Sequence, residues 1–342
     1  MTKSINLALQ GGGAHGAFTW GVIDRILEDT RIEVAAISGT SAGAMNAVLT
    51  ADGLVRAGRD GAREKLESFW KEVSVAGQFS PIRRSPLDMM LGRWSLDHSP
   101  GFAMMDVATR FFSPAQFNPL GLNPLRDVLV KHVDFDNVCK CEEMKVFISA
   151  TNVETGQVRV FKRTGLTADM VMASACLPFL FEAVEIDGVP YWDGGYTGNP
   201  PLFPLYRESG CSDIVIVQIN PVQRKGTPTS AQEIMSRMNE ITFNTSLLKE
   251  LRAMEFVKRL LDQGALDTER YHETHLHLIE AEDELKPLGA SSKLNSEWAF
   301  LTYLRDLGRN AAEHWLEQNF DCIGKESSFN LTDLFDEAEY YG

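Results

Sequence analysis

The residues best suited to chemistry in this chain surround a serine in the run Gly39-Thr40-Ser41-Ala42-Gly43. The apolar stretch 34–38 before it indicates a buried strand, and 42–49 begins a helical pattern. A serine on so sharp a turn has a strained backbone, and glycines on either side remove the side chains that would clash. The turn also places the hydroxyl at a helix N-terminus, where amide dipoles favour negative charge. Ser41 is therefore a candidate nucleophile, although the pattern alone fits an ordinary tight turn about equally well.

A second glycine-rich turn, Gly11-Gly12-Gly13-Ala14-His15-Gly16, lies between a predicted strand at 5–10 and a predicted helix at 15–30. Successive glycines let backbone N–H groups converge on one anion. That anion is the oxyanion of a hydrolase or the pyrophosphate of a dinucleotide. Dinucleotide sites also need an acidic residue at the end of the second strand, and Glu33 instead precedes it. We therefore expect an oxyanion hole formed by the amides of Gly11, Gly12, Gly13 and Ala42.

A third candidate is Asp193, which follows Tyr191-Trp192 and precedes Gly194-Gly195. An aspartate in water, with a pKa of about 3.9, is a poor base for a serine hydroxyl. Apolar neighbours and a tight glycine turn would hold and desolvate the carboxylate. Taken alone, Asp-Gly is more simply explained as a β-turn.

Together, the three motifs resemble those of the patatin-like phospholipase family, over roughly residues 5–220. GGGAHG at 11–16 is similar to the family's oxyanion loop, GTSAG at 39–43 to its nucleophile elbow, and DGG at 193–195 to the motif that carries its aspartate. Two further runs, at 173–178 and 199–202, fall where the family has similar sequences.

The resemblance implies a lipid acyl hydrolase that uses a Ser41–Asp193 dyad without a histidine and needs no metal or cofactor. The supporting motif glycines are Gly16, Gly39, Gly43, Gly194 and Gly195. One position departs from the pattern, because His15 stands where the family often has arginine or lysine. The role of His15 is left open.

The order of predicted elements favours an α/β fold with a central, mostly parallel sheet flanked by helices, as in the three-layer family architecture. The sequence predicts hairpins at 145–163 and 184–191 and a further core strand at 213–219. The composition changes near 221–229, which separates a catalytic domain at 5–220 from a mainly helical extension at 230–342 packed on it. Within that extension we expect helices at 230–263 and 297–319, a strand at 275–279, and a mobile acidic tail at 333–342.

The net charge of −14 argues against nucleic acid as a partner, because phosphate binding needs clustered Lys and Arg. Five scattered cysteines indicate reduced thiols rather than a disulfide framework. Neither a signal peptide nor an apolar run of about 18 residues is present, so we expect a cytoplasmic protein whose contact with lipid is peripheral. The sequence does not indicate an oligomeric state.

Three other functions remain open. An α/β-hydrolase with a Ser-Asp-His triad is possible because four histidines follow Asp193: His272, His275, His277 and His314. A catalytically silent lipid-binding protein could share the fold. A dinucleotide-binding oxidoreductase is the weakest of the three.

Segment 77–123 is rich in Pro, Met, Phe and Trp and lacks a sustained period. Its apolar residues could form a lid or line an acyl channel, and Arg83, Arg84 and Arg93 could meet lipid headgroups. A long connection whose aromatics bury against the sheet is an equally good interpretation. The apolar residues are Phe79, Met89, Met90, Trp94, Phe102, Met104, Met105, Phe111, Phe112 and Phe117.

Overall fold

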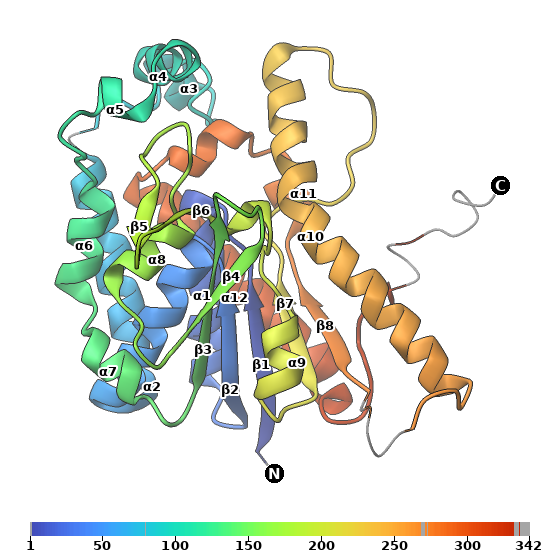
Figure 1. Cartoon of the computed structure of the whole chain (residues 1–342). Coiled ribbons are helices and arrows are strands. Elements are labelled where there is room, and N and C mark those ends of the chain that lie inside the picture. The colour runs from blue at the N-terminus through green and yellow to red at the C-terminus, as the bar shows by residue number, and fades with distance from the viewer. Residues whose placement is uncertain (1, 79, 268–270, 272, 332–334, 336–342) are drawn as a thin grey trace.

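The computed structural model describes residues 2–78, 80–267, 271, 273–331 and 335. Within these residues, eight strands form one sheet in the order β5-β6-β3-β2-β1-β7-β8, with β4 paired to β3 (Figure 1). The pairs β1–β2, β2–β3, β1–β7 and β7–β8 are parallel, whereas β3–β4, β3–β6 and β5–β6 are antiparallel. The strands are β1 Lys3–Leu9, β2 Ile32–Gly39, β3 Lys145–Asn152, β4 Val158–Lys162, β5 Val184–Ile186, β6 Val189–Asp193, β7 Asp213–Val217 and β8 His275–Ile279.

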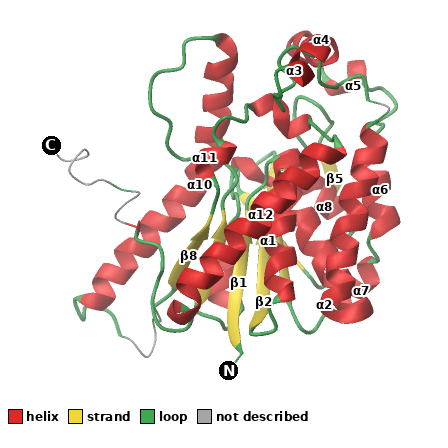
Figure 2. Ribbon diagram, turned by 180° about the vertical axis from the view of Figure 1, so that it is seen from behind, coloured by secondary structure: helices red, strands yellow, loops and turns green. Residues whose placement is uncertain are grey.

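Helices cover both faces of this sheet. Helices α1 (Gly16–Glu28), α2 (Ala42–Gly77) and α12 (Trp298–Asn319) cover one face (Figure 2). Helices α9 (Phe203–Glu208) and α10 (Ala231–Asp262) cover the other (Figure 1). The predicted α/β architecture is confirmed. The remaining helices are α3 Pro86–Met90, α4 Pro100–Phe111, α5 Pro114–Phe117, α6 Pro124–His132, α7 Phe135–Lys140, α8 Ala168–Ser174 and α11 Glu282–Leu285, with short 3-10 turns η1 Gly13–His15, η2 Gly194–Tyr196, η3 Ala290–Leu294 and η4 Phe320–Cys322.

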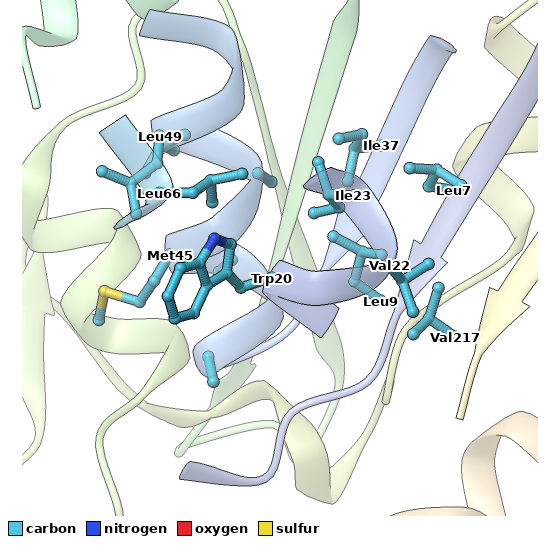
Figure 3. Close-up of a cluster of buried hydrophobic side chains, with 14 of the residues drawn as sticks. Leu7, Leu9, Trp20, Val22, Ile23, Ile37, Met45, Leu49, Leu66 and Val217 are labelled. Atoms are coloured by element: carbon cyan, nitrogen blue, oxygen red, sulfur yellow. The ribbon is translucent and has the colours of Figure 1, made fainter. Parts of the chain in front are cut away.

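Two apolar cores follow from the alternation of side chains along buried strands. Leu7 and Leu9 of β1 belong to one core with Val22 and Ile23 of α1 and residues of α2 (Figure 3). Ala8, between them, belongs to the core under α9 and α10. Strands buried on both faces have no polar face, which explains why β1 and β7 are nearly continuous apolar runs.

The C-terminal third of the chain contributes to the same three layers. Strand β8 extends the sheet in parallel beside β7. Helix α12 packs on α1 at two glycines: a Cβ at Gly21 would lie 1.9 Å from the carbonyl oxygen of Arg305, and one at Gly308 would lie 2.0 Å from that of Phe18. The region beyond 230 is mainly helical, as predicted, while the boundary at 221–229 stays a prediction. The predicted mobile tail at 333–342 lies almost entirely outside the described residues.

Segment 77–123, in which the sequence shows no sustained period, contains helices α3, α4 and α5. Each begins with proline and follows a serine: Ser85, Ser99 or Ser113. Serine accepts backbone N–H groups at a helix N-cap, and proline suits the first helical position, so Ser-Pro starts a helix here. The sequence analysis found no sustained period in this segment and therefore missed three helix starts.

Helix α2 extends well beyond 42–49, where the sequence predicts a helix to begin. Its backbone is non-helical at Ala57 and at Gly58, which has a φ of 64°. The two helical parts consequently meet at a kink. The first part begins at the Ser41 turn.

Candidate active site

The sheet register brings the three motifs to one edge. Leu9 of β1 pairs with Gly39 of β2, and Gly39 pairs with Ile148 of β3. Two residues beyond this row come Gly11, Ser41 and Ala150, and Ala150 pairs with Asp193 of β6. The glycine loop, the serine and the aspartate therefore lie at the same level, where the parallel strands end.

Ser41 occupies a strained turn between β2 and α2. Its φ is 54° and its ψ is −118°, a region that non-glycine residues rarely adopt. Its N–H donates to the Ser174 hydroxyl at 2.8 Å. The flanking glycines make the turn possible, because a Cβ at Gly39 would lie 2.5 Å from the Gly43 carbonyl oxygen and one at Gly43 would lie 2.4 Å from that of Leu9.

Asp193 is buried at the end of β6, with 1% of its surface exposed. Its Oδ1 accepts the Gly195 N–H at 2.7 Å. Burial raises the pKa of Asp193 to about 7, although hydrogen bonds from Gly195 and Ser41 and the charge of Lys293 act in the opposite direction. Such a carboxylate is a far better proton acceptor near neutral pH than a solvated one.

The contact between Ser41 and Asp193 is looser than a formed hydrogen bond. The Ser41 hydroxyl lowers the pKa of the carboxyl group, so the two groups interact. The buried Oδ2 of Asp193 nevertheless has no partner of ordinary hydrogen-bond geometry among the described residues. Catalytic hydrogen bonds are often long without substrate and tighten when it binds.

Gly194 and Gly195 fix the carboxylate against strand β3 and helix α10. A Cβ at Gly194 would lie 2.3 Å from the Ser149 carbonyl oxygen, and one at Gly195 would lie 2.4 Å from Cε1 of Phe243. These contacts hold the Asp193 turn in place. The predicted hold on the aspartate therefore has a concrete steric origin.

The glycine loop passes directly beside Ser41. A Cβ at Gly11 would lie 2.8 Å from the Cβ of Ser41, and one at Gly16 would lie 2.5 Å from the Cβ of Ala42. Gly13 has a φ of 58°, in the left-handed region that favours glycine.

The loop corrects one expectation about oxyanion donors. The amide of Gly11 donates to Oδ1 of Asn199 at 2.7 Å, so it is already occupied. No described residue accepts a hydrogen bond from the amides of Gly12, Gly13 or Ala42. These three remain the candidate donors, and Gly11 serves the close approach of the loop to Ser41.

His15 is a buried, neutral residue. Burial, with a smaller effect of the Lys293 charge, lowers its pKa to about 3. Ser292 donates its hydroxyl proton to the Gly289 carbonyl at 2.7 Å and therefore accepts the His15 Nε2–H at 2.8 Å. Nδ1 is left without a partner in the described chain. This arrangement assigns His15 a packing role beside Phe300, at 6.1 Å between ring centroids.

Lys293 reaches the site from η3, and sequence reasoning missed it. Its Nζ donates to Oδ1 of Asn220 at 2.7 Å, and Nδ2 of Asn220 donates to the Gly11 carbonyl at 2.8 Å. Its own carbonyl oxygen lies 2.4 Å from the position of a Cβ on Gly13. No local motif marks a lysine so distant in sequence.

A family model for patatin-like phospholipases matches residues 7–206, more than half of the chain. The chain belongs to the patatin-like phospholipase family. Members of this family are hydrolases that act on lipid esters. The matched segment contains the glycine loop, Ser41 and Asp193, but it ends before Lys293.

Two similar relatives of this patatin-like protein are lysophospholipases NTE1 from two strains of Cryptococcus neoformans. Each is 29% identical over 221 residues, which is 64% of this chain and 11% of the relative. The chain therefore spans about a tenth of the length of the curated relatives that it matches.

Two solved structures are also similar to this patatin-like chain. VipD from Legionella pneumophila is 14% identical with a TM-score of 0.35, and the match covers 89% of this chain and 67% of VipD. ExoU from Pseudomonas aeruginosa, solved with SpcU, is 15% identical with a TM-score of 0.32, and the match covers 92% of this chain and 53% of ExoU.

The described histidines that follow Asp193 in this patatin-like protein lie away from Ser41. His277 contacts Asp213 through Nε2 at 3.0 Å and Ser328 through Nδ1 at 2.8 Å. His275 is 3.3 Å from the same carboxylate. Asp213 begins β7, at the edge of the sheet opposite Ser41, and the exposed His314 lies on α12. His272 lies outside the described residues.

Replacing His277 with alanine is expected to reduce stability and leave catalysis intact. The change removes two buried hydrogen bonds, which lowers the unfolding free energy by about 2 kcal/mol. Ester hydrolysis should stay within about twofold of wild type, because turnover changes mainly when a reacting group is lost. Urea unfolding and a soluble-ester assay measure the two effects, with His314→Ala as the exposed control. A folded His277→Ala protein without activity would instead support a histidine triad.

Within the described residues, no helix combines the length and apolarity needed to cross a bilayer. The same residues contain no group of three or more His, Cys, Asp and Glu side chains that could hold a metal ion.

Proposed function

We propose that this protein hydrolyses the acyl esters of lipids through a Ser41–Asp193 dyad and an acyl-enzyme intermediate. One observation carries the proposal: the strained Ser41 turn faces a buried carboxyl group whose pKa is raised to about 7. A strained serine at a helix N-terminus is exposed for attack, and a carboxylate tuned to neutral pH can accept its proton.

The first half of the reaction forms the acyl-enzyme. Ser41 Oγ bonds to the acyl carbonyl carbon while its proton passes to Asp193. The carbonyl oxygen becomes an oxyanion that accepts hydrogen bonds from the N–H groups of Gly12, Gly13 and Ala42. Each such donor contributes about 100- to 1000-fold in rate. Collapse of this intermediate breaks the ester bond, and the departing alkoxide takes the proton from Asp193.

The second half releases the fatty acid. Water gives a proton to Asp193 and attacks the acyl carbon, which forms a second oxyanion in the same hole. Its collapse breaks the bond to Ser41 Oγ, which recovers its proton from Asp193. The dyad is thereby restored, and the net reaction consumes one water per ester.

We propose lysophospholipids and phospholipids as the first substrates to test, because the fungal relatives carry the name lysophospholipase. A panel of phospholipids, lysophospholipids, neutral glycerides and storage polyesters distinguishes the lipid classes. Free fatty acid is the expected product. Release of phosphocholine together with an intact glyceride would contradict attack at the acyl carbon. A folded protein inactive on the whole panel and unreactive toward a fluorophosphonate would favour the silent lipid-binding alternative.

We further propose that an apolar rim binds the lipid aggregate. Its residues lie on α3 and α4, directly after these two helices, and on the first turns of α10, and these segments project past the carboxyl edge of the sheet on either side (Figure 1). Met90 is 79% exposed, Phe111 77% and Met238 56%. Isolated exposed apolar residues are common, whereas a gathering of them around an active site marks a contact surface. The rim comprises Leu87, Met89, Met90, Leu91, Met104, Val107, Phe111, Phe112, Ile234, Met235, Met238 and Ile241.

Other residues of 77–123 pack against the rest of the protein, as expected for a long connection. Trp94 packs on Phe300 at 5.2 Å, and the Arg84 guanidinium covers Trp94 while pairing with Glu297. Arg83 and Arg93 are exposed. Phe79 and the side chain of Phe117 lie outside the described part of the chain.

The double replacement of Phe111 and Phe112 with alanine is expected to weaken vesicle binding by at least about tenfold, because it removes two large side chains from the apolar contact. Sedimentation with phosphatidylcholine vesicles measures the effect. Phe256→Ala is a matched control, since Phe256 is 50% exposed near the opposite end of α10. Equal binding by a folded double variant and wild type would refute the rim as the lipid contact.

A further inference from the structure

Lys293 brings a positive charge to a glycine loop that has none of its own. His15, the basic-type residue within the loop, is buried and neutral. Lys293 has two connections to the same loop. Its carbonyl oxygen packs against Gly13, and its ammonium group donates to Asn220, which in turn donates to the Gly11 carbonyl. The loop geometry and the lysine position are therefore linked.

The ammonium group retains unused hydrogen-bonding capacity. It has three N–H donors. One donates to Asn220, and the Phe243 ring centroid lies 5.9 Å away. Phe243 also packs against Gly195 in the Asp193 turn. Among the described residues, no carboxylate forms an ion pair with Lys293.

Among the charged groups that face Lys293, Asp193 is the one carboxylate that no arginine neutralises. These groups are Glu240, Arg224 and Asp193, and the charge of Lys293 also lowers the pKa of the neutral His15. Glu240 is already held by Arg224 at 2.7 Å and by Arg237 at 3.1 Å. Because two arginines neutralise Glu240, the field of Lys293 is left to act on the dyad.

We propose that Lys293 is the electrostatic positioning residue of the Ser41–Asp193 dyad. It holds the glycine loop through Asn220 and supplies the positive charge that stabilises first the Asp193 carboxylate and then the oxyanion. During attack, one negative charge moves from Asp193 to the oxyanion as the proton leaves Ser41. A fixed cation between the Asp193 turn and the glycine loop stabilises this charge before and after the transfer. The proposal rests on the dyad mechanism above.

The pH profile separates this role from a purely structural one. Wild-type activity should rise as Asp193 ionises near pH 7 and fall as Lys293 loses its proton, since desolvation lowers the pKa of Lys293 to about 8. Lys293→Arg keeps the charge at high pH, because arginine stays protonated, so the alkaline fall should disappear.

Neutral variants should lose rate and shift the acid side of the profile. Lys293→Met and Lys293→Gln remove the charge, and the glutamine can still donate to Asn220. Each should lower kcat by about 10- to 100-fold and move the acid limb of kcat/KM upward by about one pH unit. The effect should be equal on a neutral p-nitrophenyl ester and on a lysophospholipid, because the lysine acts on the chemistry. Lys325→Met makes the same charge change on the exposed turn after η4 and should behave as wild type.

Several outcomes would overturn the proposal. One is a folded Lys293→Met or Lys293→Gln protein with wild-type kcat and pH profile. Another is a loss confined to KM on phosphorylated lipids, which would indicate headgroup binding instead. Should the methionine variant not fold, the glutamine and arginine profiles decide. Absence of Ser41-dependent labelling in the wild-type protein would refute the dyad itself. That result is distinct from wild-type kcat in the lysine variants, which would refute only the role of Lys293.

Discussion

Replacing Ser41 with alanine is expected to abolish lipid ester hydrolysis and covalent labelling by a fluorophosphonate. The loss should be at least about a thousandfold, because the remaining oxyanion donors cannot form the acyl-enzyme. The fold should be retained, since alanine keeps the backbone N–H that donates to Ser174. Labelling detected by intact mass and fatty acid release from micelles measure the two effects.

Ser68→Ala is the matched control, because Ser68 is an exposed serine on α2, the helix that begins after Ser41. It should label and turn over as wild type. Retained labelling in Ser41→Ala would identify another serine as the nucleophile. A Ser41→Ala protein that unfolds could be replaced by Ser41→Gly, which also lacks the hydroxyl and relieves the strained φ of 54°.

Replacing Asp193 with asparagine is expected to inactivate the enzyme and also stabilise it. Asparagine cannot take the Ser41 proton, so the rate should fall by about 100- to 10,000-fold. In wild type, burial raises the pKa of Asp193 from 3.8 to about 7. Between these values the folded state holds a proton that the unfolded state has released. Stability is therefore lost as the pH rises through this window, and the full loss is present above about pH 7.

The neutral asparagine avoids the cost of the buried charge. We expect Asp193→Asn to be more stable than wild type by about 2 kcal/mol near pH 8.5 and by less near pH 6. Urea unfolding at both pH values measures the difference. Asp187→Asn is the control, since it changes the same charge at the exposed turn of the same hairpin. A stability gain that does not grow with pH would contradict the raised pKa.

Residue types and spacing were enough to predict the family and most of the sheet. Glycines are required around Ser41 and Asp193 because an added Cβ would lie only 2.3–2.5 Å from a neighbouring atom. The close packing of the site is therefore visible in the sequence as glycines. The strand at 275–279 has the bounds predicted for it. Periodicity predicts these elements because their apolar faces are buried in the two cores.

Contacts between residues far apart in sequence could not be predicted. Asn199 occupies the Gly11 amide across 188 positions, and Lys293 contacts Asn220 across 73. No local pattern encodes such pairs, because they arise only when the sheet places its loops together. The helices of 77–123 were missed for another reason. Helices α3 and α5 have only five and four residues, too few to show a period, and α4 begins at a Ser-Pro step that a search for apolar periods does not register.

The pairing of β8 with β7 bears on how the chain can be divided. A fragment ending near residue 220 would contain the Ser41 and Asp193 motifs but would leave β7 with an open row of backbone donors and acceptors. It would also uncover the face of α1 on which Gly21 meets α12. Open strand edges and bare apolar faces promote self-association. We therefore expect the motif-bearing segment to aggregate when it is expressed alone. The last third of the chain prevents this by covering the edge of β7 and the apolar face of α1.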